Sequence, residues 1–278
     1  MKIGFIGTGS MGTVLIESFI RSGALQPSSV IASNRSKHKA DLLAAKYPGL
    51  LAVDSNRQVA ATCGTIFICV RPLVFKQVVD EIKPYVTPDT TVISITSPVL
   101  LRHLESSLPC KVAKVIPSIT NGVLSGAALC IYGERMSEED RGSLEWLVGM
   151  IGKPVRVSEQ HTRVTSDISS CGPAFLAYFV QKLVDAAVHV AGLPQEEATR
   201  LASEMVLGTG KLLTAGGYTP ESLRQRVAVP GGIIEAGLEL MERELDTTFI
   251  RLLEATHAKY DEDVEKVDQQ FGSGTHTQ

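Results

Sequence analysis

The sequence has little that would support a metal site, a disulfide framework or contact with nucleic acid. Its six histidines are scattered without metal-ligand spacing, so we predict no metal site. Lysine and arginine number 27 against 30 acidic residues, a net charge of −3 with no basic stripe, and we therefore expect no nucleic-acid partner. The five cysteines form no C-x-x-C pair and are predicted to be free thiols in a reducing compartment: Cys63, Cys69, Cys110, Cys130 and Cys171.

Long apolar runs are also missing. No run approaches the roughly 18 residues that a membrane span needs, and glycines interrupt the apolar N-terminal segment where a signal peptide would be continuous. We therefore expect a cytoplasmic protein without membrane contact. At 278 residues the chain is long enough for about two domains, each with its own hydrophobic core.

The sequence does contain a glycine-rich turn between a predicted strand, Lys2–Ile6, and a segment of helical period, Thr13–Ile20. In such a G-x-G-x-x-G turn the first glycine permits the tight bend, the second lets a pyrophosphate approach, and the third lets the helix pack on the sheet. Glycine turns also occur in methyltransferases and structural corners, but this order of elements favours a dinucleotide at the helix N-terminus. The predicted cofactor-binding residues of the turn are Gly7, Thr8, Gly9, Ser10, Met11 and Gly12.

The end of the second predicted strand, Ser29–Ala32, indicates which dinucleotide is bound. NAD-dependent enzymes place Asp or Glu about 20 residues beyond the glycines, whereas an arginine there suits the 2′-phosphate of NADP. No acid stands at this strand end, which continues into Ser33, Asn34 and Arg35. Because a hydroxyl and a guanidinium can both donate to phosphate, we predict NADP(H) as the cofactor. The alternative is that Arg35 is a solvated loop residue.

Strand and helix signals alternate through the first half of the chain. Thr65–Val70 is a continuous apolar run, typical of a parallel strand buried on both faces. Ligands of open α/β sheets bind at the carboxyl ends of such strands, so Val70, Arg71 and Pro72 are expected to border the cofactor. The alternation predicts a doubly wound sheet of about eight strands. Other predicted strands are 50–53, 91–96, 112–116 and 127–132, and predicted helices are 37–47, 56–62, 75–85, 100–108 and 137–150.

From about residue 160 onward the chain has helical period and no further strand signal. We predict an N-terminal Rossmann-type domain over residues 1–159, an all-α dimerisation domain over 160–271 and a disordered tail over 272–278. Pro173–Ala191 is apolar around most of its circumference, so a homodimer or higher homo-oligomer is expected. Its polar stripe of Gln181, Asp185 and His189 is expected to be a solvated face and not a catalytic group.

These motifs, in this order, resemble the pyrroline-5-carboxylate reductases over nearly the whole chain. Besides the glycine turn, the resemblance rests on Val70–Pro72 for the family's Val-Lys-Pro, Cys171–Ala174 for Ser-Gly-Pro-Ala, and Pro230–Gly232 within Ser-Pro-Gly-Gly-Thr-Thr. Within the family, three loops look like those of a late-competence branch of bacilli: Ser94–Pro98, Pro117–Asn121 and Ser170–Phe175.

The resemblance implies a Rossmann domain, a helical dimerisation domain, and an active site between them that the partner's glycine loop completes. It also implies NADPH-dependent reduction of a cyclic imine, pyrroline-5-carboxylate, to proline in the last step of proline synthesis. Hydride transfer to a protonated imine depends on positioning more than on acid–base groups, which are few here. The substrate-binding residues implied are Cys171, Gly172, Pro173, Val229, Pro230, Gly231, Gly232, Ile233 and Ile234.

Departures from the family pattern fall in the substrate loops. Val229 replaces a serine, and Ile233 and Ile234 replace two threonines. The backbone N–H groups of Gly231 and Gly232 are then the donors left for a substrate carboxylate. No side chain receives a certain catalytic role, because the position of the family threonine that would contact the imine nitrogen is occupied by Ile234.

Two other functions are compatible with the sequence. One is a non-catalytic NADP(H)-binding regulatory protein of competence, which the apolar loop from Val229 to Ile234 favours. The other is an enzyme like the 2-hydroxyacid dehydrogenases, which requires a lysine near the start of the long helix. This chain has Leu176 at that position, and the first lysine on the helix is Lys182.

Overall fold

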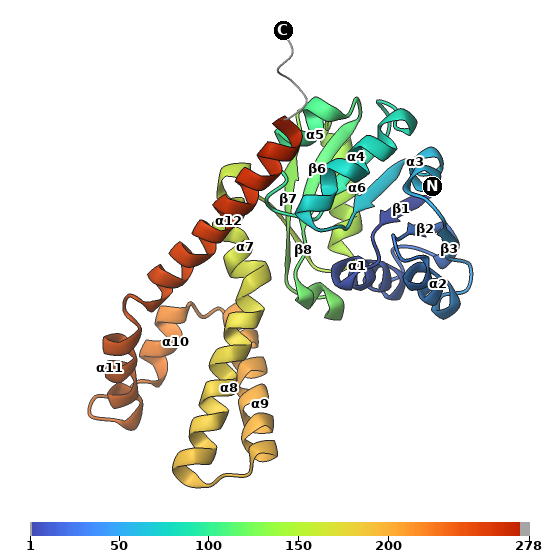
Figure 1. Cartoon of the computed structure of the whole chain (residues 1–278). Coiled ribbons are helices and arrows are strands. Elements are labelled where there is room, and N and C mark those ends of the chain that lie inside the picture. The colour runs from blue at the N-terminus through green and yellow to red at the C-terminus, as the bar shows by residue number, and fades with distance from the viewer. Residues whose placement is uncertain (1, 273–278) are drawn as a thin grey trace. The chain divides into compact units, whose positions relative to one another are not determined.

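The computed structural model of the protein describes residues 2–272 and divides into two compact units (Figure 1). The sheet unit contains residues 2–171 and 256–272, and the helical unit contains Gly172–Ala255. The predicted domain boundary at residue 159 stays a prediction. The predicted disordered tail begins at Gly272, which is the last residue of a helix, and residues 273–278 lie outside the described part of the chain.

The sheet unit is built on one eight-stranded sheet with the order β3-β2-β1-β4-β5-β6-β7-β8. All neighbouring strands are parallel except β6 and β7, which are antiparallel. The strand order reverses beside β1, as in a doubly wound fold, so the predicted fold class is confirmed. The strands are β1 (Ile3–Ile6), β2 (Val30–Ser33), β3 (Leu51–Val53), β4 (Thr65–Ile68), β5 (Thr91–Ser94), β6 (Lys111–Ile116), β7 (Ala127–Tyr132) and β8 (Lys153–Arg156).

Strand β8 is not among the predicted strand ranges, and several elements end earlier than predicted, among them β5, which ends at Ser94 and not at residue 96. A proline in the sequence of β8, Pro154, argues against a central strand, but β8 lies at the edge of the sheet, where a missing N–H is tolerated. β4 ends at Ile68 and not at Val70. The helix predicted over 75–85 ends at Ile82 and continues as a 3-10 turn that contains Pro84, which cannot donate a helical hydrogen bond.

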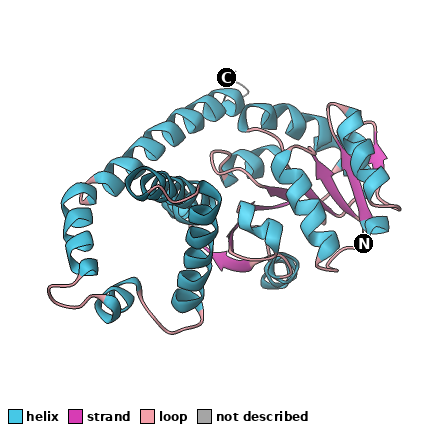
Figure 2. Ribbon diagram, turned by 90° about the horizontal axis from the view of Figure 1, so that it is seen from below, coloured by secondary structure: helices cyan, strands magenta, loops and turns pink. Residues whose placement is uncertain are grey.

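Helices cover both faces of the sheet (Figure 2). On one face α1 (Ser10–Arg21), α2 (Lys37–Lys46) and α6 (Glu138–Gly149) pack on a cluster in which the Phe5 and Phe67 rings stack at 5.1 Å. On the other face lie α3 (Asn56–Thr62), α4 (Phe75–Ile82) and α5 (Leu101–Ser107). Short 3-10 turns occur at Pro27–Ser29, Pro72–Val74, Lys83–Tyr85, Ile119–Val123 and Glu159–His161.

Residues 256–272 of the last helix, α12 (Thr248–Gly272), also pack on the sheet unit. Nε2 of the buried His103 lies 2.5 Å from Asp268, and Arg102 donates to the same carboxylate at 2.7 Å. The His103 ring stacks on Phe271. Its Nδ1 accepts a hydrogen bond from the N–H of Leu100 at 3.1 Å, so the ring is neutral with its proton on Nε2.

A second polar cluster surrounds a buried carboxylate at the end of α7 (Thr162–Ser166). Asp167 opens a π-helical segment, Asp167–Cys171, and accepts hydrogen bonds from Arg163 at 2.7 Å and from Thr256 Oγ1 at 3.0 Å. Nε2 of His257 lies 3.4 Å from the same carboxylate. This cluster joins the segment before the long helix to α12. No short-range pattern predicts it, because Asp167 and Thr256 are 89 residues apart in the chain.

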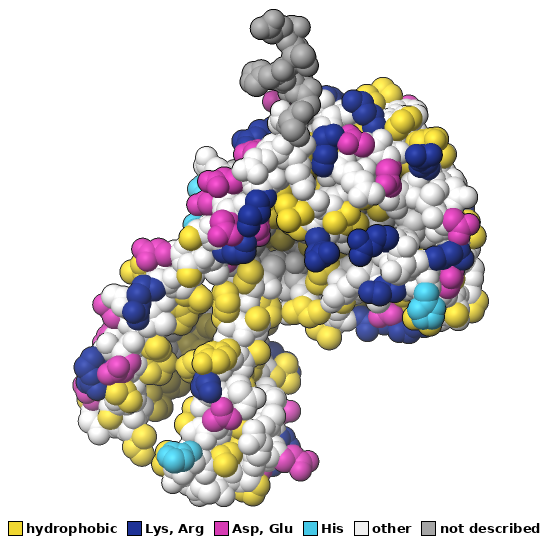
Figure 3. Space-filling view, viewed as in Figure 1, with side chains coloured by type: hydrophobic (Ala, Val, Ile, Leu, Met, Phe, Trp, Pro, Cys, Tyr) yellow, Lys and Arg dark blue, Asp and Glu magenta, His cyan; other side chains and the backbone are white. Residues whose placement is uncertain are grey.

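The helical unit contains α8 (Gly172–Ala191), α9 (Gln195–Thr214), α10 (Pro220–Val227), α11 (Ile233–Leu245) and the start of α12. α8 and α9 pack through a small core of Val184, Ala198 and Ala202. Many large apolar side chains of this unit stay exposed, and they gather along its helices in Figure 3. Those on α8 include Leu176, Tyr178, Phe179, Leu183 and Val190.

We expected no apolar run long enough to span a membrane, but the helical stretch Glu159–Ala191 meets this criterion. By length and composition this stretch could cross a membrane, with a mean hydropathy of 1.3 in a window that is 6% buried. One such helix among the described residues is weak support for a membrane span, because helices that become covered by protein pass the same test. The low burial is also what an uncovered oligomer interface would show.

Candidate functional site

A pocket of about 560 Å³ lies in the sheet unit where β1, β2 and β4 end. Its position at the carboxyl edge, beside the reversal of strand order, is where open α/β sheets bind their ligands. Of the predicted cofactor residues, the structure brings seven together on its wall: Gly7, Gly9, Ser33, Asn34, Arg35, Val70 and Arg71. The other five, Thr8, Ser10, Met11, Gly12 and Pro72, belong to the same glycine turn, to the first turn of α1 or to the 3-10 turn after Arg71.

The glycines of the turn differ in what they do. Gly7 has φ +101°, and a Cβ added at Gly12 would lie 2.1 Å from the Gly7 carbonyl oxygen, so both positions are needed for the local fold. A Cβ at Gly9 would meet nothing within 4 Å. Gly9 is also the N-cap of α1, with no side-chain cap and no acid in the first turn. The open space at Gly9 and the uncapped helix N-terminus fit a pyrophosphate group.

The end of β2 is tied to the glycine turn through Asn34. Its Oδ1 accepts a hydrogen bond from the Thr8 N–H at 3.0 Å, and its Nδ2 donates to the Ser36 carbonyl at 3.0 Å. Ser33 is 1% exposed and donates its hydroxyl hydrogen to Asn56 Oδ1 at 2.8 Å. We expected the Ser33 hydroxyl to donate a hydrogen bond to a phosphate. In the structure its hydroxyl hydrogen is bonded to Asn56 instead, so this expectation does not fit.

Four cationic side chains line the pocket: Arg35, Lys39, Arg57 and Arg71. Within residues 2–272 none of the four forms an ion pair, although Asp54 and Glu81 lie on the same wall. Unpaired cations beside an uncapped helix suit the phosphates of a dinucleotide. The sequence interpretation missed Lys39 and Arg57. Lys39 lies in the first turn of α2, shortly after Arg35, whereas Arg57 reaches the pocket only through the pairing of β2 with β3.

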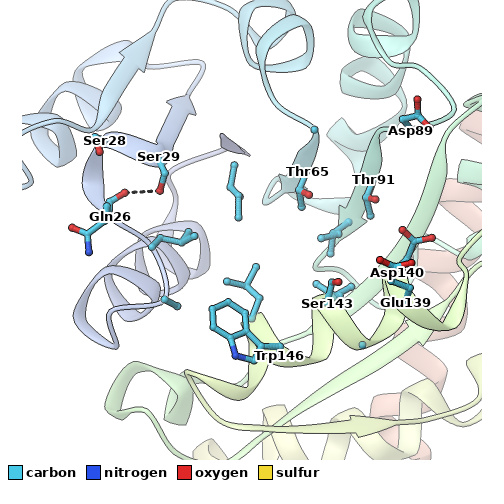
Figure 4. A pocket seen from close by; sticks show the side chains of 18 residues that line it. Gln26, Ser28, Ser29, Thr65, Asp89, Thr91, Glu139, Asp140, Ser143 and Trp146 are labelled. Atoms are coloured by element: carbon cyan, nitrogen blue, oxygen red, sulfur yellow. Dashed lines mark hydrogen bonds between the residues drawn. The ribbon is translucent and has the colours of Figure 1, made fainter. Parts of the chain in front are cut away.

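A larger pocket of about 1040 Å³ lies at the opposite edge of the sheet, at the amino ends of β1, β4 and β5 (Figure 4). Glu139 and Asp140 lie beside each other at its α6 wall, and Trp146 lies farther along that helix. Among the described residues that line it none is Lys or Arg, and Asp140 is paired with Lys111 at 2.7 Å. These carboxylates would repel phosphate, so this pocket is not the cofactor site.

The predicted substrate residues fall in two places. Cys171 ends the π-helical segment, and its sulfur accepts a hydrogen bond from Arg163 at 3.2 Å. Gly172 and Pro173 follow it as the first residues of α8. The other group, Val229 to Ile234, joins α10 to α11 and belongs to the helical unit, whereas the cofactor pocket belongs to the sheet unit.

The Val229–Ile234 loop has no free donor at its two glycines. Gly231 has φ +72°, and its N–H donates to Glu235 Oε2 at 2.5 Å. The Gly232 N–H donates to the Val229 carbonyl at 2.8 Å. Our expectation that both N–H groups are available to a substrate carboxylate is therefore wrong for this structure. The side chains of Val229, Ile233 and Ile234 are exposed and carry no polar atom.

Two family models match the chain. Residues 159–263 match the pyrroline-5-carboxylate reductase dimerisation family, and residues 2–98 match the family described as NADP oxidoreductase coenzyme F420-dependent. The first match covers the helical unit and its flanks, and the second covers the glycine turn and the pocket.

Known proteins resemble the chain over nearly its full length. ComE operon protein 4 of Bacillus subtilis is 41% identical over 98% of this chain and 99% of its own, in line with the late-competence resemblance. Pyrroline-5-carboxylate reductase 3 of B. subtilis is 30% identical over 97% and 99%. The solved pyrroline-5-carboxylate reductase of Coxiella burnetii has a TM-score of 0.84 at 27% identity, covering 94% of this chain and 98% of its own. The Plasmodium falciparum enzyme, solved with NADP bound, has a TM-score of 0.83 at 23% identity over 96% and 98%, and supports the fold alone. The chain therefore belongs to the pyrroline-5-carboxylate reductase family.

Proposed function

We propose that the protein reduces a cyclic imine with NADPH, and that pyrroline-5-carboxylate, reduced to proline, is the foremost substrate. The observation that carries this proposal is the pocket at the carboxyl edge of the sheet, where an uncapped helix N-terminus meets four cationic side chains that form no ion pair with any residue from 2 to 272. Family membership over nearly the whole chain supports the reaction class.

In this proposal the residues of the pocket hold NADP(H) by its phosphates. The first N–H groups of α1 beyond Gly9 would hold the pyrophosphate, and Arg35 would hold the 2′-phosphate with help from Lys39 and Arg57. Val70, Arg71 and Pro72 border the cofactor. When bound, the reduced nicotinamide supplies a hydride for the electrophilic carbon of a protonated imine.

The protein's contribution to the reaction is to position the imine and exclude water, because Cys171 is the one acid–base side chain among the candidate substrate residues. In the Val229–Ile234 loop the side chains of Val229, Ile233 and Ile234 are apolar and exposed, and by family resemblance we expect this loop and the start of α8 to contact the imine. Ile234 has no side-chain oxygen that could accept a hydrogen bond from the protonated ring nitrogen. We therefore expect slower turnover of pyrroline-5-carboxylate than in relatives that carry a hydroxyl there.

The same proposal includes a homodimer and a cytoplasmic role in proline synthesis. The dimer would be formed through residues 159–263, which match the family's dimerisation model and expose the apolar side chains of α8. Covering these side chains by a second copy would remove a large apolar surface from water.

The second candidate is a non-catalytic regulator that binds NADP(H). The Val229–Ile234 loop favours it, because the side chains of Val229, Ile233 and Ile234 cannot form hydrogen bonds to a substrate. The dehydrogenase alternative has no support, since Leu176 occupies the lysine position. The test is calorimetric binding of NADPH together with an assay for proline formed from pyrroline-5-carboxylate. Binding with turnover supports the enzyme, binding without turnover supports the regulator, and absence of both contradicts the proposal.

A further inference from the structure

The turn before α11 contains an anion of its own. The backbone at Gly231, with φ +72°, directs its N–H toward the side chain of Glu235 one helical turn later, and the N–H donates to Oε2 at 2.5 Å. Hydrogen bonds to an ionised acceptor are shorter and stronger than neutral ones, and this distance is at the short end of their range. Glu235 is half-buried, so its carboxylate is only partly hydrated.

The first turn of α11 favours this arrangement. Its N-cap is Gly232, which offers no side-chain acceptor, and Glu235 is the acid of the first turn. A carboxylate there balances the partial positive charge of the helix N-terminus. The Gly232 N–H donates to Val229, so the chain itself uses the donors of both glycines.

A substrate carboxylate that approaches this turn would meet a like charge and an occupied donor. The backbone N–H groups of Ile233 and Ile234 at the start of α11 are also open to a carboxylate, but a carboxylate bound there would lie beside Glu235, and this like charge costs free energy. The neighbouring side chains of Ile233 and Ile234 offer no compensating donor. An imine ring without a carboxylate would meet neither obstacle.

We propose that Glu235 is a specificity-determining residue that weakens recognition of the substrate carboxylate, so that the protein accepts cyclic imines lacking this group nearly as well as pyrroline-5-carboxylate. This inference rests on the proposed function, because it takes the Val229–Ile234 loop as part of the imine site. It adds an identified residue and a substrate class to that function.

The test compares two imines and three proteins. Pyrroline-5-carboxylate and 1-pyrroline share the ring and its nitrogen and differ only in the carboxylate. The variant is Glu235→Gln, which keeps an acceptor for the Gly231 N–H but removes the charge, and the matched control is Glu239→Gln, the same change on the exposed face of α11 one turn later. The ratio of kcat/KM for the two imines isolates the carboxylate, because effects on the ring nitrogen cancel.

Glu235→Gln is expected to raise this ratio roughly tenfold in favour of pyrroline-5-carboxylate, mainly through a lower KM. Glu239→Gln is expected to leave it unchanged. A Glu235→Gln ratio equal to that of the wild type, or an equal rise in both variants, would overturn the inference while leaving imine reduction intact.

If none of the three proteins reduces either imine, the proposed reaction is wrong. A binding measurement then still tests whether Glu235 weakens recognition of a carboxylate. Calorimetry on the NADP⁺-loaded protein would compare proline with pyrrolidine, which lacks the carboxylate. Proline binding that tightens relative to pyrrolidine in Glu235→Gln supports the role of Glu235. An unchanged preference, or no proline binding by the variant, contradicts it.

Discussion

The hydroxyl of Ser33 donates a hydrogen bond to Oδ1 of Asn56 at 2.8 Å, which connects the end of β2 to the first turn of α3. Asn56 in turn donates to Glu81 at 2.7 Å. Ser33, Asn56 and Glu81 all line the pocket and are bonded to one another. The cationic side chains on the same pocket wall are therefore the groups that we expect to recognise phosphate. We therefore expect Ser33 to support the pocket, and Arg35 with its cationic neighbours to discriminate between NADPH and NADH.

Replacing Arg35 with alanine is expected to raise the Kd for NADPH roughly tenfold to 150-fold, the equivalent of one charge-assisted hydrogen bond. The Kd for NADH should change little, because NADH lacks the 2′-phosphate. Ser33→Ala is expected to weaken both cofactors alike. Titration calorimetry of the wild type and both variants with both cofactors measures the six Kd values. Equal affinities of the wild type for NADPH and NADH, or a selectivity loss in Ser33→Ala alone, would refute this assignment.

Two glycine substitutions separate folding from binding in the turn. Gly12→Ala places a Cβ 2.1 Å from the Gly7 carbonyl, so it should destabilise the protein by about 1–3 kcal/mol through local overpacking. Gly9→Ala meets no protein atom within 4 Å, so its stability should match the wild type while a methyl group obstructs the pyrophosphate. Urea denaturation and NADPH titration test the pair. Unchanged NADPH affinity in Gly9→Ala would mean that the pyrophosphate binds elsewhere.

The parts of this fold that depend on local pattern could be predicted from the sequence. The turn from Gly7 to Gly12, the alternation of strands and helices, and the helix predicted over 137–150 follow from short-range signals. The structure has the Ser137 Oγ at the start of that helix accepting from the Asp140 N–H at 3.1 Å. What could not be predicted depends on side chains distant in sequence. Arg57 reaches the pocket only through strand pairing, and the engagement of the Gly231 N–H by Glu235 depends on one backbone angle.

The contact between His103 and Asp268 predicts a pH dependence of stability. Burial lowers the pKa of His103 below its ordinary value, against the opposing effect of Asp268. Between about pH 6.5 and that lower pKa, the unfolded chain binds a proton that the folded chain does not, so the free energy of unfolding should fall as the pH falls. Urea denaturation across this range should give a smaller slope for His103→Asn than for the wild type. The exposed His38→Asn serves as the control, and an identical slope in all three proteins would contradict this account.

The exposed apolar face of α8 predicts a dimer. Leu183 is 46% exposed in the single chain, and a charge introduced there should oppose burial between two copies. Multi-angle light scattering is expected to show a dimer for the wild type and a shift toward monomer for Leu183→Glu. Leu42→Glu changes a leucine of similar exposure, 56%, on α2 of the sheet unit and should leave the dimer intact. A wild type that is monomeric at micromolar concentration would refute the interface.

The most direct test of the central claim is the kcat/KM for NADPH oxidation with pyrroline-5-carboxylate, measured with proline formation. The wild type should form proline at one molecule per NADPH, slowly, because Ile234 offers no hydrogen bond to the ring nitrogen. Ile234→Thr, alone or with Val229→Ser, should raise kcat/KM by roughly tenfold to 150-fold, the value of one hydrogen bond to a charged group. No proline from the wild type or from these variants would contradict the assignment as a reductase of this imine. If the wild type is as efficient as its relatives, or if restoring the hydroxyls gives no gain in kcat/KM, the missing hydroxyl at position 234 does not limit the reaction.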